Sequence, residues 1–457
     1  DDACSTPAGR GKIELAKHPS EISMSAHSSY PYPRFFRVRQ KFEAPRVDDI
    51  PGTVHAELGR LGLERQVKPG QTVAITAGSR GIANISVIIK AAVQFFQKLG
   101  AKPFIVPAMG SHGGGTAAGQ RGIIEGYGIT EEFCGCPIKA GMETIVVCQT
   151  AEGFPVHFDK HASQADHVLV VGRVKPHTDF VGDVESGLMK MMLIGLGKHE
   201  GAKVYHRAIL DYSFPQIVRS VAGRVLERCP ILAGLAIVEN GYDQTAKIAA
   251  VSAAELEARE RELLKLARQW MPKLPFQLVD ILLIDELGKN ISGAGIDTNV
   301  VGRKFQFHQA AEDEYPKVKR IVIRGLTEET HGNASGIGLV EFCTTRALRQ
   351  IDPVKTRINC LTSGNVAACM VPCDFETDRE ILDAALPTIG LTEPTDAKII
   401  WIRNTLSLAE VECSQKYWNE ARERPDLEVL TELRTLPLDS AGNLPRLVDN
   451  VAAHAAA

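Results

Sequence analysis

The sequence predicts an α/β protein of two domains, in which mainly parallel sheets are flanked by helices. Three observations support this expectation. Short apolar runs alternate with longer helical stretches from about residue 71 onward, which is the pattern of parallel strands joined by crossover helices. The alternation occurs in two series, separated by a proline-containing segment. A length of 457 residues also exceeds that of one ordinary domain.

The strands of the first series are apolar runs that end in turns. They are expected at residues 72–77, 103–107, 144–148, 167–173 and 235–239. A helix rich in Glu, Arg and Leu follows at 254–269, and its charged face is most simply a solvated surface. The second series is expected at 279–285, 320–324, 357–361 and 398–402. The boundary therefore falls near Pro272 to Pro275, which gives domains of residues 1–272 and 273–457.

The two ends of the chain lack the periodicity of core elements. Residues 1–45 include Tyr30-Pro31-Tyr32-Pro33 and hold few periodic apolar positions, so this stretch is expected to be an arm laid over a domain. Small residues from Ala452 to Ala457 give the other end no structural signal.

The overall composition is that of a globular protein with small-molecule partners. Apolar residues make up 44% and charged residues 23%, and the formal net charge is −3. No basic field is available to hold a nucleic acid backbone or an anionic membrane surface. No apolar run reaches the ~18 to 20 residues of a membrane span. We therefore expect neither a nucleic acid nor a membrane partner.

The ten cysteines are scattered, and several lie in apolar strand-like runs. Cys134/Cys136 and Cys369/Cys373 have spacings that could suggest metal or redox chemistry, but neither pair is CxxC and no ligand pattern repeats. Free thiols in a reducing compartment are the favoured interpretation, so the cytoplasm is expected. The chain begins at Asp1 rather than Met, which leaves the question of a removed export signal open.

Three glycine-rich turns follow predicted strand ends, and each holds a polar or cationic side chain. They contain Ser79 and Arg80, then His112 with Gly113 and Gly114, and then His177. In open α/β sheets, ligands bind at the carboxyl ends of strands, where glycines let the backbone approach and exposed amides face anions. The second turn lacks both the GK[ST] of a P-loop and a GxGxxG fingerprint, so a conventionally bound nicotinamide cofactor is disfavoured.

A lysine and two histidines stand out in the stretch from residue 173 to 206. Lys190 lies in Gly187-Leu188-Met189-Lys190-Met191-Met192, where loss of water would lower its pKa and make its amine nucleophilic. A snorkelling lysine on a buried helix is the structural alternative. His199 and His206 are seven residues apart, which on one helix is too far to chelate one ion together.

The ordered set of these motifs resembles the nickel-dependent lactate racemase superfamily, and the likeness is clearest from about residue 70 to 210. That superfamily has an arginine turn, a Gly-[TS]-His turn, a Pro-His turn with a later Gly-containing segment ending in Lys, and a histidine sixteen residues after that lysine. The matching elements here are Arg80, Gly110-Ser111-His112, Pro176-His177, Ser186-Gly187-Leu188-Met189-Lys190 and His206.

The resemblance implies a nickel-pincer nucleotide, pyridinium-3-thioamide-5-thiocarboxylic acid mononucleotide nickel. It implies that Lys190 carries this group covalently and that His206 is the protein ligand of nickel, which imidazole suits. Residues 1–272 would then form the cofactor-binding catalytic domain. Cofactor contacts are expected at Ser79, Arg80, Gly113, Gly114 and Gly187, and cofactor-synthesis enzymes are expected to be transient partners.

The implied activity is racemisation or epimerisation of a small 2-hydroxy acid through a planar 2-keto acid, in the cleft between the domains. The two enantiomers present the hydroxyl proton from opposite sides, so we assign His112 and His177 as the two bases. Arg80 and Lys289 are the candidates to bind the substrate carboxylate, although Lys289 is equally explained as a surface lysine. Short aliphatic, lactate-like acids are preferred because no cationic cluster in the sequence suggests a dicarboxylate.

This chain departs from the lactate racemases in three places. An Asp that precedes their first-turn arginine is absent from Ala77-Gly78-Ser79-Arg80, the interval from His177 to Lys190 is three residues longer, and Leu188-Met189 replaces a Gly-Arg pair. Two alternatives stay open. One is a zinc-dependent lyase or hydrolase built from His112, His177 and His206, and the other is a hydroxy-acid-binding protein that has lost the cofactor.

Overall fold

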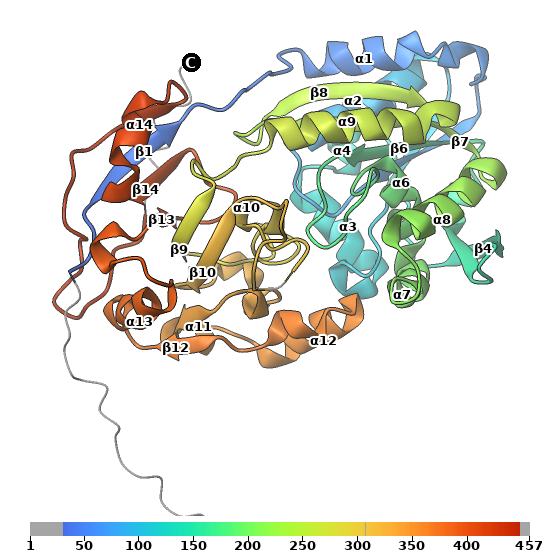
Figure 1. Cartoon of the computed structure of the whole chain (residues 1–457). Coiled ribbons are helices and arrows are strands. Elements are labelled where there is room, and N and C mark those ends of the chain that lie inside the picture. The colour runs from blue at the N-terminus through green and yellow to red at the C-terminus, as the bar shows by residue number, and fades with distance from the viewer. Residues whose placement is uncertain (1–30, 307, 448–457) are drawn as a thin grey trace, which may run out of the picture.

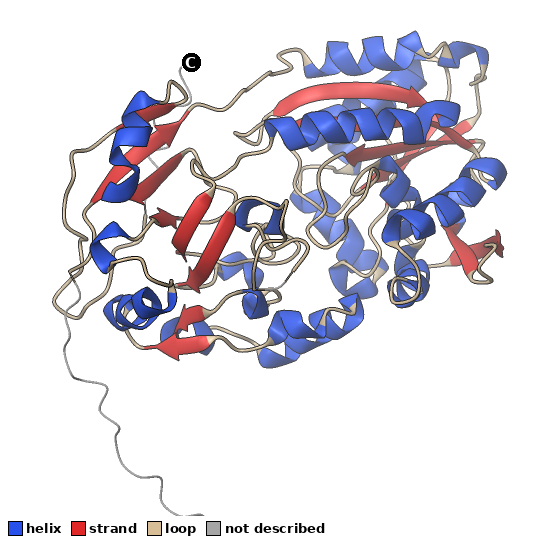
Figure 2. Ribbon diagram, in the orientation of Figure 1, coloured by secondary structure: helices blue, strands red, loops and turns tan. Residues whose placement is uncertain are grey.

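Fifteen strands form two main sheets and one hairpin in the computed structural model, which describes residues 31–306 and 308–447 (Figures 1 and 2). The strands are β1 (Phe35–Gln40), β2 (Thr72–Ala77), β3 (Lys102–Pro107), β4 (Thr144–Gln149), β5 (Pro155–Asp159), β6 (His167–Arg173), β7 (Ile231–Glu239), β8 (Thr245–Ser252), β9 (Leu278–Ile284), β10 (Lys317–Ile323), β11 (Phe342–Thr344), β12 (Cys373–Phe375), β13 (Ile399–Ile402), β14 (Glu410–Ser414) and β15 (Leu427–Val429).

The first sheet has the order β3-β2-β6-β7-β8, and only its β7–β8 pair is antiparallel. The second sheet has the order β12-β11-β10-β9-β13-β14-β1-β15, and the run from β12 to β13 is parallel. Strands β4 and β5 form a separate antiparallel hairpin. The predicted α/β fold with mainly parallel sheets and flanking helices is confirmed.

Helices cover both faces of the first sheet and surround the second (Figure 1). Val54 of α1 and Ile88 of α2 pack on one face of the first sheet, whereas Leu188 of α6 and Leu263 of α9 pack on the other. Helix bounds are α1 (Ile50–Arg60), α2 (Ile85–Lys98), α3 (Ala117–Gly126), α4 (Glu131–Cys134), α5 (Lys160–Ser163), α6 (Leu188–Lys190), α7 (Lys198–Ala208), α8 (Phe214–Arg228), α9 (Leu256–Trp270), α10 (Thr298–Val301), α11 (Thr345–Arg349), α12 (Pro353–Ser363), α13 (Asp378–Ala385) and α14 (Trp418–Glu423).

The strand predicted at 357–361 is wrong, because these residues lie inside α12. The carboxylate of Asp352 accepts the amide N–H groups of Val354 and Lys355, both at 3.0 Å, and Pro353 occupies the first helical turn. An Asp-Pro start is a strong helix signal, and it outweighs the apolar residues that suggested a strand.

The arm predicted for residues 1–45 is wrong where it falls on β1, and its first 30 residues lie outside the described ones. Strand β1 pairs with β14 on one side and with β15 on the other. Its sequence, Phe35-Phe36-Arg37-Val38-Arg39-Gln40, buries Phe36 and Val38 completely. Residues 35–40, which belong to the predicted first domain, are therefore part of the second sheet. The division into domains of residues 1–272 and 273–457 stays a prediction.

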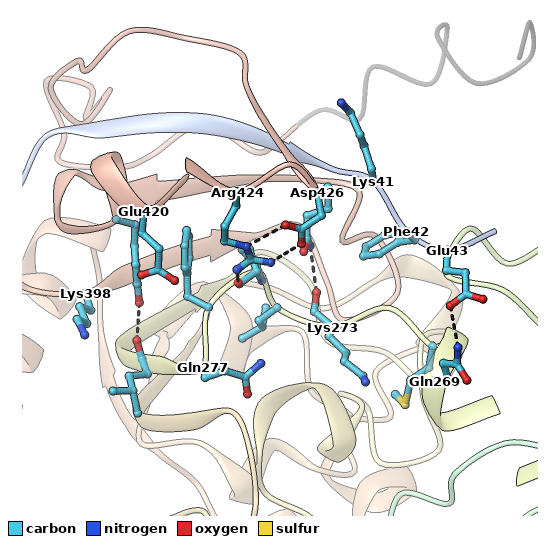
Figure 3. Close-up of a pocket in the computed structure, with 17 residues that line it drawn as sticks. Lys41, Phe42, Glu43, Gln269, Lys273, Gln277, Lys398, Glu420, Arg424 and Asp426 are labelled. Carbon is cyan, nitrogen blue, oxygen red and sulfur yellow. Dashed lines mark hydrogen bonds and ion pairs between the residues drawn. The ribbon is translucent and has the colours of Figure 1, made fainter. Parts of the chain in front are cut away.

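The chain crosses between the two sheets at residues 41–49 and 271–277, and these crossings lie beside each other. The carboxylate of Glu43 accepts the Nε2–H of Gln269 at 2.8 Å and the Nε1–H of Trp270 at 3.1 Å. A cavity of about 450 Å³ adjoins the crossings (Figure 3). None of the site residues expected from the sequence lines it.

The cysteines and the helices bear on the expected compartment and on a membrane partner. Each cysteine within the described residues is a free thiol. No helix in the described part of the chain has the length and apolar character needed to cross a bilayer.

Candidate active site

The expected site lies where the carboxyl ends of strands from both sheets meet. The turns after β2, β3 and β6 hold Arg80, His112 and His177, and the loop after β9 holds Lys289. Nη1 of Arg80 donates to the carbonyl of Lys289 at 3.1 Å, and Nδ2 of Asn299 donates to the carbonyl of His177 at 3.1 Å. Hydrogen bonds therefore join the two halves of the chain at this site.

The structure brings the six charged or imidazole side chains chosen from the sequence into one group. Loss of water has the largest effect on the pKa of His112, and the charges of Arg80, Lys289, Lys190 and His206 lower it further, to about 3. Burial also has the largest effect on the pKa of His177, and the charges of Lys190 and Arg80 lower it further. Mutual electrostatic effects of this kind require proximity, so residues up to 209 positions apart share one site.

His112 is held through its Nδ1 atom. The hydroxyl of Ser79 makes a short hydrogen bond with Nδ1, and the hydroxyl of Tyr127 donates to the carbonyl of Ser79 at 2.9 Å. A hydroxyl can donate or accept, so either neutral tautomer of His112 is compatible with this contact. With a pKa near 3, the ring is neutral at physiological pH, and its Nε2 can accept a proton in the tautomer that carries the ring proton on Nδ1.

His177 is held differently. Its Nδ1 accepts the amide N–H of Asp179 at 3.0 Å and that of Phe180 at 3.2 Å. Its ring stacks on Phe180 with centroids 4.3 Å apart, and its own amide N–H donates to Oε2 of Glu185 at 2.7 Å. Burial, together with neighbouring cations that include Lys190, keeps the pKa of His177 well below its usual range.

Lys190 lies at the junction of α6 and a π-helical turn, Met191–Gly195. The carboxylate of Glu260, from α9, accepts the amide N–H of Met189 at 2.9 Å. A side chain at Gly187 would place its Cβ 2.5 Å from the carboxyl carbon of Glu260, so any larger residue here would force the carboxyl group of Glu260 to move. Loss of water and the charge of Arg80 lower the pKa of Lys190 to about 7, which leaves much of the amine nucleophilic at neutral pH.

A break in the helix returns the chain toward Lys190. Sixteen residues of continuous α-helix would separate Lys190 and His206 by roughly 24 Å. Instead, Lys198 adopts a left-handed conformation with φ of 55° at the start of α7. The charge of Lys190 lowers the pKa of His206, after the larger effect of burial, so the two side chains lie near each other.

Lys198 itself has a structural role. Its side chain and that of Asp159 are completely buried, with Nζ 3.1 Å from Oδ2 of Asp159. The same Nζ donates to the carbonyl of Pro107 and, at 3.4 Å, to Oε1 of Gln120. Since Nε2 of Gln120 donates to the carbonyl of Gly110 at 3.0 Å, this network braces the turn that carries His112. A fully buried, ion-paired amine is not available for covalent attachment.

His206 has the free donor atom that a nickel ligand needs. Its Nδ1 is buried and has no hydrogen-bond partner. Nδ1 of His199 is also buried and unpartnered, but the ring of His199 lies against Gly115, whereas the charge of His206 contributes to the lowered pKa of His112. Lys190 and His206 together therefore fit the tethered nickel nucleotide implied by the sequence.

The zinc alternative is not supported by the geometry. Across residues 31–306 and 308–447, no three His, Cys, Asp or Glu side chains are placed to hold a metal ion. His112, His177 and His206 therefore do not form a three-ligand zinc site. A nickel ion with one protein ligand needs no such cluster.

Arg80 and Lys289 supply cations without carboxylate partners in the described structure. Nζ of Lys289 donates to the carbonyl of Gly293, and burial with the charge of Arg80 lowers the pKa of Lys289 to about 8. By contrast, Arg173 pairs with Glu239 and Lys175 pairs with Asp297. Arg80 and Lys289 are therefore the cations best able to bind an incoming carboxylate.

The glycines of the second turn have different reasons to be glycine. A Cβ on Gly113 would lie 2.5 Å from the backbone of Gly119, whereas a Cβ on Gly114 would meet no atom within 4 Å. Both have positive φ, 65° and 67°. Gly113 is thus required for packing, while open space beside Gly114 leaves room for a ligand.

Sequence reasoning missed three acidic residues here. Asp179 lies exposed in the site, Glu185 is buried and holds the His177 turn, and Glu260 is 1% exposed although its helix face was expected to be solvated. Glu260 follows Leu256 by four residues and precedes Leu263 by three, so its place on the apolar stripe of α9 was a usable signal.

No family model and no curated protein matches this sequence. Among solved structures, the fold is similar to that of the lactate racemase apoprotein from Thermoanaerobacterium thermosaccharolyticum, with 11% identity, a TM-score of 0.50 and coverage of 81% of this chain and 93% of that chain. A structure of a protein from Thermotoga maritima is 13% identical, with a TM-score of 0.43 and coverage of 70% of this chain and 81% of that chain. The chain thus shares the fold of the lactate racemase apoprotein.

Proposed function

We propose that this chain is a racemase or epimerase of small 2-hydroxy acids that works with a nickel-pincer nucleotide tethered to Lys190. One observation carries the proposal: several reactive groups lie together where the carboxyl ends of strands from both sheets meet. They are a lysine with a lowered pKa, an imidazole with an unpartnered nitrogen, two further histidines and two cations without a carboxylate partner. The shared fold of the lactate racemase apoprotein supports it. Short aliphatic, lactate-like acids are the proposed substrates.

The residues of this chain suit the group in separate ways. Lys190 would form the covalent link through its amine, and His206 would donate its free imidazole lone pair to nickel. Ser79, Arg80, Gly113, Gly114 and Gly187 would surround the nucleotide. When bound, the group supplies an acceptor for the hydride of the substrate α-carbon.

The remaining side chains bind substrate and handle its hydroxyl proton. Arg80 and Lys289 would hold the carboxylate, which fixes the α-carbon between the two histidine turns. His112, neutral and anchored by Ser79 at Nδ1, would accept the hydroxyl proton at Nε2 and return it. His177 would act on the opposite side, where the second enantiomer presents its oxygen.

Chiral analysis of short 2-hydroxy acids tests the proposal. Protein from cells that also make the cofactor should interconvert the enantiomers and contain nickel, whereas the Lys190→Ala variant should do neither. Lys203→Ala is the matched control, because Lys203 is an exposed lysine paired with Glu200. Zinc without nickel would favour a lyase or hydrolase, and substrate binding without turnover by nickel-loaded protein would favour a sensor. Either result would contradict the proposal.

A further inference from the structure

The loop that follows His177 is fixed by hydrogen bonds from both halves of the chain. Glu185 accepts the amide N–H of His177 at 2.7 Å and that of Gly182 at 3.1 Å. From the other half, Oγ1 of Thr298 donates to the carbonyl of Thr178 at 2.5 Å. These hydrogen bonds fix the backbone on both sides of Asp179, so the position of Asp179 is restrained by the fold.

This loop fixes the tautomer of His177. An imidazole nitrogen that accepts backbone N–H groups must present its lone pair, and Nδ1 of His177 accepts two of them, from Asp179 and Phe180. The proton of the neutral ring therefore resides on Nε2. A second proton would have to be added at Nδ1, against two amide dipoles and the charges of Lys190, Lys304, Lys175 and Arg80. His177 can donate a hydrogen bond from Nε2, but it cannot accept the substrate proton there.

Asp179 supplies the acceptor that His177 lacks. Its side chain is exposed, and within the described residues its one side-chain hydrogen bond comes from Oγ1 of Thr178 at a long 3.4 Å. The charged groups that act on it are Lys190, Lys289 and Asp297. Lys190 and Lys289 are the residues assigned to the cofactor and the substrate carboxylate, so the carboxylate of Asp179 lies close to the groups that would hold both.

We propose that Asp179 is a catalytic base and that the neutral ring of His177 donates an Nε2 hydrogen bond to the substrate oxygen. This inference rests on the proposed function and divides the second base role between two residues. As the hydride leaves the α-carbon with its electron pair for the acceptor that the cofactor supplies, the substrate O–H bond breaks. The proton bonds to a carboxylate oxygen of Asp179, and the pair left on oxygen forms the C=O bond of the keto acid. On return, Asp179 gives the proton back.

This division of roles follows general catalytic logic. A neutral imidazole N–H can stabilise the negative charge that develops on the substrate oxygen without gaining or losing a proton. The exposed carboxylate of Asp179 has one long side-chain hydrogen bond, so it keeps lone pairs that can accept a proton, and the charges of Lys190 and Lys289 favour its ionised form. His112 keeps its role on the other side, because its Ser79 contact permits a free Nε2. The two sides of the site are therefore chemically different.

The tautomer is tested in protein without cofactor. Long-range ¹H–¹⁵N spectra of protein labelled with ¹⁵N-histidine should show His177 with its proton on Nε2 and no second protonation down to mildly acidic pH. The His177→Gln variant identifies the signals by their loss. An Nδ1–H tautomer, or a ring that becomes cationic near neutral pH, would overturn the inference whatever the enzyme activity.

Variants of the loaded enzyme test the proton acceptor. Asp179→Asn should lower kcat for racemisation by ~10² to 10⁴-fold, the usual effect of removing a general base. His177→Ala should lose ~10² to 10³-fold, and His177→Gln, which restores an N–H donor but no base, should recover most of that loss. Asp183→Asn is the matched control, because Asp183 lies in the same loop but pairs with Arg219 and Arg261.

The outcomes separate this inference from the proposed function. Racemisation by the wild type with near-normal Asp179→Asn activity and no rescue by His177→Gln would overturn the inference alone and return the base role to His177. Absence of racemisation by nickel-loaded wild type would overturn the proposed function and the role of Asp179 with it.

Discussion

The carboxylate of Glu260 accepts the amide N–H of Met189 at 2.9 Å, so a residue of α9 holds the helical turn that carries Lys190. The carboxyl group occupies the space that a side chain at Gly187 would need. Burial raises the pKa of Glu260 to about 7, and its Oε1 has no hydrogen-bond partner. The turn is therefore positioned by an acidic group buried at an energetic cost, which is common at functional sites.

Gly187→Ala should destabilise the protein, because its Cβ would lie 2.5 Å from the carboxyl carbon of Glu260. Overpacking of this kind costs roughly 1–3 kcal/mol, measurable by urea denaturation. In the background of Glu260→Ala the same substitution should cost much less, since the clashing group is gone. Gly122→Ala is the control, because a Cβ there meets no atom within 4 Å. Equal costs in both backgrounds would show that Glu260 does not occupy this space.

Lys190 should react with small amine reagents at unusually low pH. Its pKa of about 7 predicts a labelling midpoint near pH 7 in protein without cofactor, with Lys289 following near pH 8. Ordinary lysines titrate near ~10.4. Peptide mass spectrometry across a pH series measures the order, and labelling of Lys190 only above pH 9 would contradict the account.

The same pKa predicts a stability trend. The folded pKa of Lys190 lies below its unfolded value, so between about pH 7 and ~10.4 the unfolded chain binds more protons at this residue. The contribution of Lys190 to stability should therefore rise with pH through that window. The difference in unfolding free energy between wild type and Lys190→Met should change in this direction as pH increases, and a flat difference would argue against the lowered pKa.

Asp159→Asn should be strongly destabilising, because it leaves the buried charge of Lys198 without its partner. Breaking a buried pair in this way typically costs about 3–5 kcal/mol. Glu143→Gln is the matched control: its ion pair with Lys160 is on the surface, with Glu143 74% exposed, and such pairs contribute about 0–1 kcal/mol. Denaturant titrations of the two variants should differ accordingly, and similar small losses would mean that Lys198 is neutral or solvated.

His206→Ala should lose bound nickel, whereas His199→Ala should retain most of it. Both imidazoles have a buried, unpartnered Nδ1, but His206 is the one that comes sixteen residues after Lys190, and the charge of Lys190 acts on its pKa after the larger effect of burial. Metal analysis and the visible absorption of the loaded protein distinguish the variants. Nickel retained by His206→Ala and lost by His199→Ala would reverse the assignment.

Most of the parallel strands could be predicted because buried strands are continuous apolar runs. The run at 72–77 matches β2 at both ends. The sequence signals failed where local and tertiary effects competed. The capping pair Asp352-Pro353 turned a strand-like run into α12, and β1 could not be placed because its partners, β14 and β15, come more than 360 residues later.

The site residues found from the sequence are those next to glycine turns and those in spaced motifs. Asp179 was missed although it follows His177 by two residues. Its role depends on the nearby charge of Lys289, which is 110 residues away in the sequence and comes close only in the folded chain. Glu260 was missed because it was treated as one acidic residue among several in α9. In both cases the decisive contact crosses from one element to another, and no local pattern records it.

The central claim, that Lys190 carries the cofactor, is tested most directly by peptide mass mapping of protein made together with the cofactor-synthesis enzymes. The added mass should lie on the peptide that contains Lys190 and should disappear in Lys190→Ala. No mass should be added to Lys198, because its amine is buried against Asp159. Added mass on Lys198 or Lys203, or no covalent addition in protein that racemises 2-hydroxy acids, would contradict the assignment.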